Sequence, residues 1–260
     1  MEKRKARILQ EVISLSHHLK TYPAPRFWPI LRKEKEWTVK PRPGPHPQDR
    51  SIPLAIILRD ILKYAETMKE VKKILAERKV LVDRVVRKDY KFPVGLMDVI
   101  SLPDAKKNFR VLPHSTYFLT LVEIPDEEAN FKLCRIENKT TVKRGNIQLN
   151  LHDGRNLLIR VNDPFNPVED TYSTLDVLKL SLPDGKLLET FKLEKGAWAI
   201  IIGGENVGRY GVIEEISDVG FKRKNLVTIR LLNGEKAITI MDYIFVIGRD
   251  SPIITLPEGG

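Results

Sequence analysis

The side chains that could support catalysis are few, and their spacing matches no catalytic or metal-binding pattern. The histidines stand at positions 17, 18, 46, 114 and 152, and none is spaced from cysteines or carboxylates as metal ligands are. The motifs H-E-x-x-H, G-x-S-x-G and C-x-x-C are absent. Asp153 belongs to an Asp-Gly turn, and Asp163, Glu169 and Asp170 are expected to form a solvated loop. The sequence therefore predicts no enzyme activity, no metal and no other cofactor.

A glycine-rich run, Gly203 to Gly211, is the one segment that could be mistaken for a nucleotide-binding loop. It lacks the G-x-x-x-x-G-K-[ST] pattern, and it connects two strand-like segments rather than a strand and a helix. No helix N-terminus is therefore offered to a phosphate. We expect no small-molecule substrate.

The chain is expected to work in the cytoplasm. It contains no apolar run of 18 residues, and its basic N-terminus is not followed by the uninterrupted apolar stretch of a secretory signal. Cys134 is the only cysteine, so no internal disulfide can form, and a buried apolar position is expected for it. No membrane partner is predicted by these features.

The basic residues are the most informative group, because they are concentrated in one part of the chain. The net charge is +10; residues 1–110 carry 26 Lys/Arg against 13 Asp/Glu, whereas residues 111–260 carry 18 against 21. Such an asymmetry indicates a polyanionic partner for the first part. RNA, DNA and an anionic membrane surface all fit this charge distribution.

Residues 1–50 are expected to form a basic arm. Alternating prolines at 41, 43, 45 and 47 favour an extended path, and high charge leaves little apolar surface to bury, so we expect the arm to be largely disordered when free. Phe27, Trp28 and Trp37 could stack on bases, although docking onto the protein is the favoured interpretation. The arm's candidate phosphate-binding residues are Arg26, Arg32, Lys33, Lys40 and Arg42.

Two helices must position the next group of cations. Ser51 is a plausible N-cap for the first, whose buried face is expected to hold Leu54, Ile57, Leu58, Ile61 and Leu62. Thr67 and Glu70 form a capping box for the second, with Val71, Ile74 and Leu75 inward. Strands are expected at 80–82 and 96–102, with a tight turn at Asp83-Arg84. Further candidates on these elements are Arg59, Lys63, Lys69, Lys72, Lys73, Lys79, Arg84, Arg87, Lys88 and Lys91.

The remaining sequence is expected to be almost entirely β-structure. Asp153-Gly154, Asp184-Gly185 and Asn233-Gly234 each separate two strand-like segments, which predicts three hairpins. Strands at 197–202 and 212–216 flank the glycine-rich loop and fit a small SH3-like barrel. The predicted class is α+β, with a small helical module followed by mostly antiparallel β domains.

Several segments resemble the archaeal and eukaryotic type of small-subunit ribosomal protein four, the S-four-e family. They are HLKTYPAPRFWPI, KPRPGPH, SIPLAIILRDILKYA, VRKDYKFPVGLMDVISL, RVLP, IQLNLHDGRN and KGAWAIIIGGENVGRYGVI. The likeness covers about 240 residues in the family's order, and the chain looks archaeal rather than eukaryotic. KPRPGPH and KDYKFPVGLMDV are its most specific segments.

The resemblance implies a structural constituent of the small ribosomal subunit that binds ribosomal RNA and supports translation. It implies a basic arm (1–50), an S-four-type RNA-binding domain (51–113), a central β domain (114–192) and a KOW-like barrel with a C-terminal tail (193–260). In the barrel, Arg209, between Gly208 and Gly211, matches the family's glycine-basic loop. The implied partners are ribosomal RNA and neighbouring ribosomal proteins, without an obligate homo-oligomer.

Two departures from the family pattern stand out. MEKRKARILQEVISLS replaces a short Gly/Lys/Arg-rich leader, and Asp83-Arg84 stands where relatives commonly have Asp-Gly. If that turn requires a positive φ, an arginine there costs about 1 kcal/mol. The alternatives are an RNA-modifying enzyme that carries the same module, which lacks a catalytic motif here, and a transcription factor that uses the barrel, which leaves the basic N-terminal half unexplained.

Overall fold

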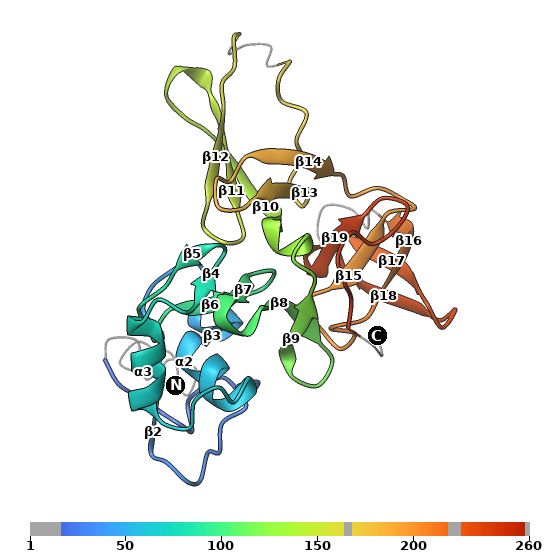
Figure 1. Cartoon of the computed structure of the whole chain (residues 1–260). Helices are drawn as coiled ribbons and strands as arrows, with labels where there is room; N and C mark the ends of the chain where they lie inside the picture. The colour runs from blue at the N-terminus through green and yellow to red at the C-terminus, as the bar shows by residue number, and fades with distance from the viewer. Residues whose placement is uncertain (1–16, 164–167, 218–224, 258–260) are drawn as a thin grey trace, which may run out of the picture. The chain divides into compact units, whose positions relative to one another are not determined.

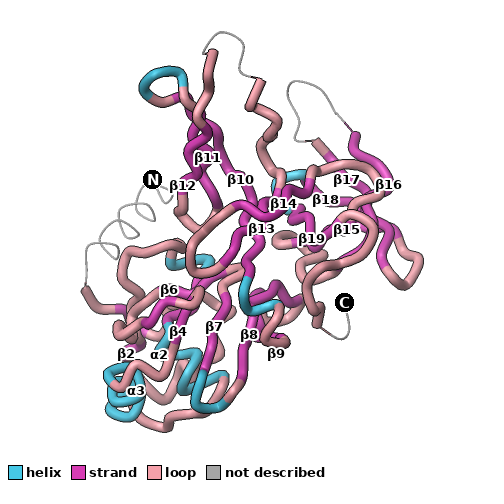
Figure 2. Tube along the Cα trace, turned by 45° about the horizontal axis from the view of Figure 1, so that its top comes forward, coloured by secondary structure: helices cyan, strands magenta, loops and turns pink. Residues whose placement is uncertain are grey.

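The computed structural model describes residues 17–163, 168–217 and 225–257, which divide into two units (Figure 1). Unit 1 contains the chain up to Arg78 together with Arg87–Val94, and unit 2 contains Lys79–Val86 and the chain from Gly95 onward. Strands predominate, and the helices are short (Figure 2). Within these described ranges, no helix has the length and apolar character needed to cross a bilayer.

The arm is packed in unit 1, so the expectation that it has little to bury is wrong for residues 17–50. Strands β1 (Leu19–Lys20) and β2 (Trp37–Thr38) pair antiparallel. Trp28 is 2% exposed, and its indole Nε1 donates a 2.8 Å hydrogen bond to the carbonyl of Ser51. The Trp28 ring and the side chain of Leu19 supply the buried apolar surface that the charged, proline-rich composition did not predict.

The first helix of unit 1 begins later than expected. Strand β3 (Ser51–Pro53) pairs with β6 (Pro93–Gly95), and the helix then runs as α2 (Leu54–Ile56) and a π-helical turn η2 (Ile57–Ile61). Ser51 does not cap it, because its hydroxyl donates to the carbonyl of Pro47 at 2.8 Å. The buried face is largely as expected, with Leu54, Ile57 and Leu58 almost fully buried.

The second helix, α3 (Met68–Ala76), matches its sequence signals. The Thr67 hydroxyl accepts from the backbone N–H of Glu70, and the Glu70 carboxylate accepts from the N–H of Thr67, which completes the predicted capping box. Val71 and Leu75 are buried, which leaves the lysines of the helix on its exposed side.

The first sheet of unit 2 carries the turn that departs from the family pattern. Its strand order is β5-β4-β7-β8-β9. The strands are β4 (Leu81–Val82), β5 (Val85–Val86), β7 (Val99–Leu102), β8 (Lys107–His114) and β9 (Phe118–Ile124). Asp83 and Arg84 both have positive φ, 53° and 61°, as a two-residue type I′ hairpin turn requires. The expected domain limit at residue 113 falls inside the β8–β9 hairpin.

The central sheet of unit 2 has the order β12-β11-β10-β13-β14 and is antiparallel throughout. Its strands are β10 (Phe131–Thr141), β11 (Ile147–Leu151), β12 (Asn156–Ile159), β13 (Val177–Ser181) and β14 (Leu187–Phe191). The Asp153-Gly154 and Asp184-Gly185 turns join strands as predicted, and both glycines have positive φ.

The last sheet has the order β18-β17-β16-β15-β19 and fits the predicted SH3-like barrel. Its strands are β15 (Trp198–Ile201), β16 (Tyr210–Ser217), β17 (Leu226–Leu231), β18 (Lys236–Ile240) and β19 (Ile244–Gly248). The Asn233-Gly234 turn joins β17 to β18, as predicted. One apolar core continues from this sheet to Leu112, Leu133 and Val177, so the sheets of unit 2 are packed together rather than independent.

Candidate nucleic-acid interface

Five of the predicted cations meet around one loop of unit 1, and we call Arg42, Lys72, Arg87, Lys88 and Lys91 the Tyr90 cluster. The ammonium groups of Lys72 and Lys91 lie 5.0 and 5.7 Å from the centre of the Tyr90 ring. Lys72 comes from α3 and Lys91 from the loop that leads into β6. The tyrosine ring therefore holds two elements and their positive charges in one place.

The arm and the loop are joined by Arg42. Its guanidinium pairs with the carboxylate of Asp89 at 2.9 Å, and its backbone N–H donates to the carbonyl of Lys91 at 3.0 Å. On the same loop, the guanidinium of Arg87 lies 4.4 Å from the centre of the Phe92 ring. The arm, α3 and the loop thus contribute to a single cationic site.

The Tyr90 cluster has few acids of its own. Asp89 is its one carboxylate between residues 87 and 92, and its second oxygen accepts from the backbone of Lys91. Within the described part of the chain, Arg87 Nε is buried without a hydrogen-bond partner.

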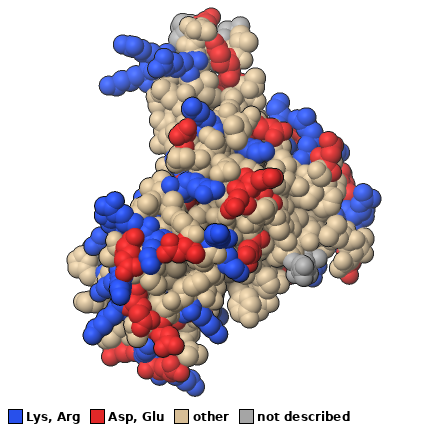
Figure 3. All heavy atoms as spheres, in the orientation of Figure 1, with Lys and Arg blue, Asp and Glu red and all other residues tan. Residues whose placement is uncertain are grey.

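The other lysines of α3, Lys69 and Lys73, are exposed. Lys73 lies four residues after Lys69 and Lys72 lies three residues after it, so the three share one side of the helix. Acidic side chains are interspersed among the basic ones on the face of unit 1 that Figure 3 shows. On that face the cations do not form the continuous surface that the charge count suggested. The positive potential is instead concentrated where aromatic rings and backbone contacts gather the cations.

Arg32 and Arg59 have structural partners that limit their part in phosphate binding. Arg32 donates to the carbonyls of Thr21, Tyr22, Ala24 and Pro25 at 2.7–3.2 Å, and these bonds hold the arm in its folded path. Arg59 makes a two-pronged pair with the adjacent Asp60 at 2.9 and 2.7 Å. The hydrogen bonds that Arg59 donates to Asp60 outweigh partial burial and raise the pKa of Arg59 above its ordinary value. Lys63 lies just beyond the helix, with a positive φ of 56°.

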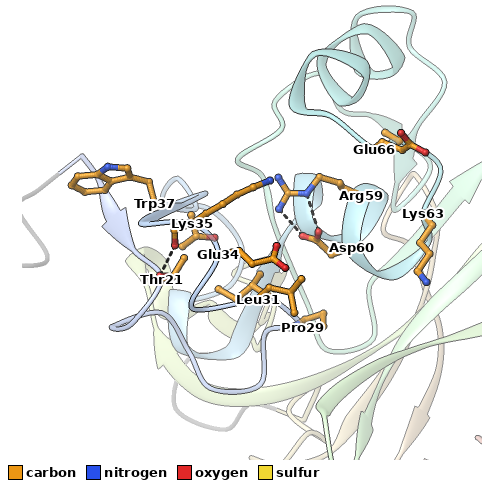
Figure 4. Close-up of a pocket in the computed structure, with 13 residues that line it drawn as sticks. Thr21, Pro29, Leu31, Glu34, Lys35, Trp37, Arg59, Asp60, Lys63 and Glu66 are labelled. Carbon is orange, nitrogen blue, oxygen red and sulfur yellow. Dashed lines mark hydrogen bonds and ion pairs between the residues drawn. The ribbon is translucent and has the colours of Figure 1, made fainter.

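Arg59 and Lys63 also line an open pocket of about 530 Å³ in unit 1 (Figure 4). Glu34, Asp60 and Glu66 line it too, so three carboxylates balance three cations, the third being Lys35. Trp37, at its rim, is 53% exposed and carries Lys20 at 5.2 Å from its ring centre. The mixed charge makes this pocket a weaker phosphate site than the Tyr90 cluster.

The remaining predicted residues are dispersed. Arg26 and Lys33 are exposed in the arm, and Lys40 is half-buried there. In unit 2, Lys79 pairs with Asp104 at 3.2 Å, and Arg84 donates to the Ala129 carbonyl and the Asn130 side chain. Arg209 is exposed and lies 3.8 Å from Glu235. These side chains do not join one site within either unit.

Sequence reasoning missed a buried charge network in unit 2. Lys132, on β10, is fully buried and pairs with Asp98, with Asp83 at 2.8 Å and with Asp153 at 3.2 Å. Arg155 adds a second cation, 2.8 Å from Asp83 and 3.2 Å from Asp153. Asp153 is therefore more than a turn residue, and the interpretation of it as one was incomplete.

Within the network, the pKa values of the acidic side chains shift in opposite directions. Burial alone would lower the pKa of Lys132, but Asp98 and Asp83 hold it well above its ordinary value. Burial raises the pKa of Asp83, against the pull of Lys132, whereas Lys132 and His152 hold the pKa of Asp153 below its usual range despite its burial. Cys134 is buried as expected, but its thiol lies 3.5 Å from the Asp153 carboxylate rather than in a purely apolar setting, and burial raises the pKa of the thiol. Only the alternation of β10 could have hinted at Lys132, because its position faces the core.

Comparison with known proteins agrees with this geometry. The family described as ribosomal family S4e matches residues 105–187, the RS4NT domain matches 15–49 and the S4 domain matches 52–100. Small ribosomal subunit protein eS4 of Desulfurococcus amylolyticus is 57% identical over 244 residues, 94% of this chain and 97% of that protein. The chain belongs to the ribosomal S4e family. The eS4 proteins of Aeropyrum pernix and Methanocaldococcus jannaschii are 54% and 48% identical over 93% and 92% of this chain.

A solved member of the S4e family supports the same architecture. The crystal structure of the 30S ribosomal protein S4e from Thermoplasma acidophilum is 34% identical, with a TM-score of 0.63, and the match covers 77% of this chain and 96% of that one. The S4 match at 52–100 includes α3 and the 87–92 loop. The Tyr90 cluster is thus built largely on the part of this S4e chain that matches the S4 domain.

Proposed function

We propose that this chain is a structural constituent of the small ribosomal subunit that binds ribosomal RNA and acts without catalysis. The observation that carries the proposal is the Tyr90 cluster, in which cations from the arm, α3 and the 87–92 loop meet around two aromatic rings. Charges of this kind neutralise phosphates and release the counterions condensed on RNA.

The proposed partners are small-subunit ribosomal RNA and neighbouring ribosomal proteins, in the cytoplasm. The names of the relatives, small ribosomal subunit protein eS4, support this setting. The proposal of a role without catalysis is supported by the buried carboxylates of unit 2, because they are engaged in ion pairs with Lys132 and Arg155. We propose one copy of the chain per subunit rather than an obligate homo-oligomer.

Salt-dependent RNA binding tests the proposal directly. Replacing Lys72, Arg87 and Lys88 with glutamate should make the negative slope of log affinity against log salt shallower by about 2, since each lost phosphate contact contributes about 0.7–0.9. The matched control reverses three exposed lysines of unit 2, Lys186, Lys192 and Lys195, and should leave the slope nearly unchanged. Equal slopes for the wild type and the cluster variant would remove the Tyr90 cluster from the interface.

Cell fractionation tests the setting of the function. In a sucrose gradient at low salt, the chain should sediment with small subunits, and high salt should release the cluster variant before the wild type. Co-sedimentation with RNA polymerase instead would favour a transcription factor, and turnover of RNA by the purified protein would favour an enzyme.

A further inference from the structure

The free end of the central sheet is a positively charged region within an otherwise acidic part of the chain. Residues 138–162 carry five Lys/Arg and one Asp, a net charge of +4, whereas the rest of 111–260 carries 13 Lys/Arg and 20 Asp/Glu, a net charge of −7. The charge count for the whole C-terminal part therefore conceals a local reversal of sign. The chain segments involved are the ends of β10, β11 and β12.

Three of these cations project from the end of the sheet without acidic partners. Lys143 and Arg144 form the turn between β10 and β11, and Arg160 follows β12. All three are exposed, and none lies within ion-pair distance of an acid in the described part of the chain. Figure 3 shows basic side chains extending into solvent at this end of the molecule.

The nearby acids already have partners. Lys139 pairs with Asp170, and Glu169 accepts a 2.6 Å hydrogen bond from the side chain of Asn162. Lys139 therefore balances the charge of Asp170, whereas Glu169 keeps its charge, because its donor is a neutral amide. The three projecting cations therefore keep their charge available for a partner from outside.

The turn that presents the cations is fixed by its own hydrogen bonds. Asn146 donates from its side-chain amide to the Lys143 carbonyl at 3.2 Å and accepts from the backbone N–H of Val161 at 3.1 Å. It thus ties the β10–β11 turn to the end of β12, beside Arg160. Arg144 has a φ of 66°, a conformation that favours glycine, so the turn presents this arginine from a strained backbone position.

The outer face of the same strands carries amide side chains beside one exposed leucine. Asn156 and Leu158 are exposed on the side of β12 that Arg160 shares by its two-residue alternation. On β11, the amide of Gln148 bonds to the side chain of Asn150 at 2.8 Å. Amides and cations are the donors that contact phosphate and sugar oxygens.

We propose that Lys143, Arg144 and Arg160 form a second RNA-binding site, at which the free end of the central sheet binds the phosphate backbone. This site is separate from the Tyr90 cluster and lies in the other unit. The proposal rests on the proposed function in taking ribosomal RNA as the polyanion. Two separate sites on one chain raise the overall affinity, because binding at one increases the local concentration of RNA at the other.

The test measures binding of the full-length chain to in vitro transcribed small-subunit ribosomal RNA over a range of salt. Replacing Lys143, Arg144 and Arg160 with glutamate should make the negative slope of log affinity against log salt shallower by about 2. Between about 50 and 200 mM salt, the variant should therefore lose roughly 16-fold less affinity than the wild type. A glutamine triple, which removes charge without adding acid, should lower the slope equally. The control is the triple reversal at Lys186, Lys192 and Lys195, which are equally exposed in unit 2.

Hydroxyl-radical footprinting on the same complexes separates the two sites. The variant with Lys143, Arg144 and Arg160 replaced, here called the hairpin variant, should lose one protected RNA segment. It should keep the segment whose protection depends on Lys72, Arg87 and Lys88. A slope and footprint identical to those of the control variant would overturn the second site while leaving the proposed function intact. If neither the hairpin nor the Tyr90 variant altered RNA binding, both proposals would fail. Normal RNA binding combined with poor incorporation into subunits would indicate an acidic protein at the hairpin and would also overturn the proposal.

Discussion

Replacing Lys132 with methionine tests how unit 2 is held together. The substitution keeps much of the side-chain length and volume but removes the buried ammonium group. In the native chain this group faces three carboxylates, including those of Asp83 at 2.8 Å and Asp153 at 3.2 Å. Its removal leaves those carboxylates short of positive charge in a position where water cannot replace it.

The expected loss is large. Removing one partner from a buried ion pair costs about 3–5 kcal/mol of unfolding free energy, because the remaining charge stays buried. Arg155 still reaches Asp83 and Asp153, whereas Asp98 loses its ion pair with Lys132 and keeps, among its contacts, the hydrogen bond from the Gly95 backbone N–H at 2.8 Å. Adding Asp98→Asn should therefore recover about 1–3 kcal/mol, since the amide removes a buried charge that Lys132 had balanced while keeping the shape.

The pH dependence gives a second signature. The pKa of Lys132 is raised, so its contribution to stability is fully present below its ordinary pKa of 10.5 and is lost as the pH rises toward the folded-state value. In acid, the stranded carboxylates of the variant take up protons and their penalty shrinks. The difference in unfolding free energy between the wild type and Lys132→Met should thus be widest between neutral and mildly alkaline pH and should narrow on both sides.

Urea unfolding followed by circular dichroism, repeated across the pH range, provides the measurement. The matched control is Lys179→Met on the adjacent strand β13, where the ammonium lies 4.0 Å from Glu189 and the side chain is 21% exposed. That change should cost at most about 1 kcal/mol. A cost below about 1 kcal/mol for Lys132→Met at neutral pH, or no recovery on adding Asp98→Asn, would refute the reasoning.

Three further substitutions test other parts of the molecule. Trp28→Ala should cost about 3–5 kcal/mol by removing a buried ring and its bond to Ser51, and limited proteolysis should then cut residues 17–50, which should resist it in the wild type. Gly208→Ala should cost roughly 2 kcal/mol or more in thermal unfolding, because its φ is 85° and a Cβ would lie 2.7 Å from the backbone nitrogen of Ser115; an unchanged Tm would contradict this. Arg144→Gly should raise stability by up to about 1 kcal/mol by relieving its positive φ while weakening RNA binding, and a parallel loss of both would show that the arginine stabilises the turn.

Local signals along the chain predicted local structure well. The capping box of α3 and the three glycine turns were readable because each depends on residues within a few positions of one another. The tight turn at Asp83-Arg84 was readable for the same reason, whereas its positive φ values were only a condition until the structure showed them. The start of the first helix was wrong, because Ser51 joins a strand that pairs with residues about forty positions away.

The candidate interface could be predicted in composition but not in arrangement. The charge count identified the basic part of the chain, yet it could not distinguish Arg32, which holds the arm together, from Arg42, which joins the arm to the 87–92 loop. Both are arginines in a proline-rich segment, and only their tertiary partners differ. The sequence likewise provided the number of acidic residues among the cations of unit 1, but not their positions on its surface.

The order of residues by itself determined the family, the α+β class, the turns and the sign of the charge in each part of the chain, because these depend on residue type and short spacing. Tertiary structure decided that a lysine of the β-rich half closes a buried network with Asp83, Asp98 and Asp153, and that a ring at Tyr90 gathers cations from separate elements. Such contacts join positions tens of residues apart, and the energy of a charge depends on the burial and partners that folding gives it.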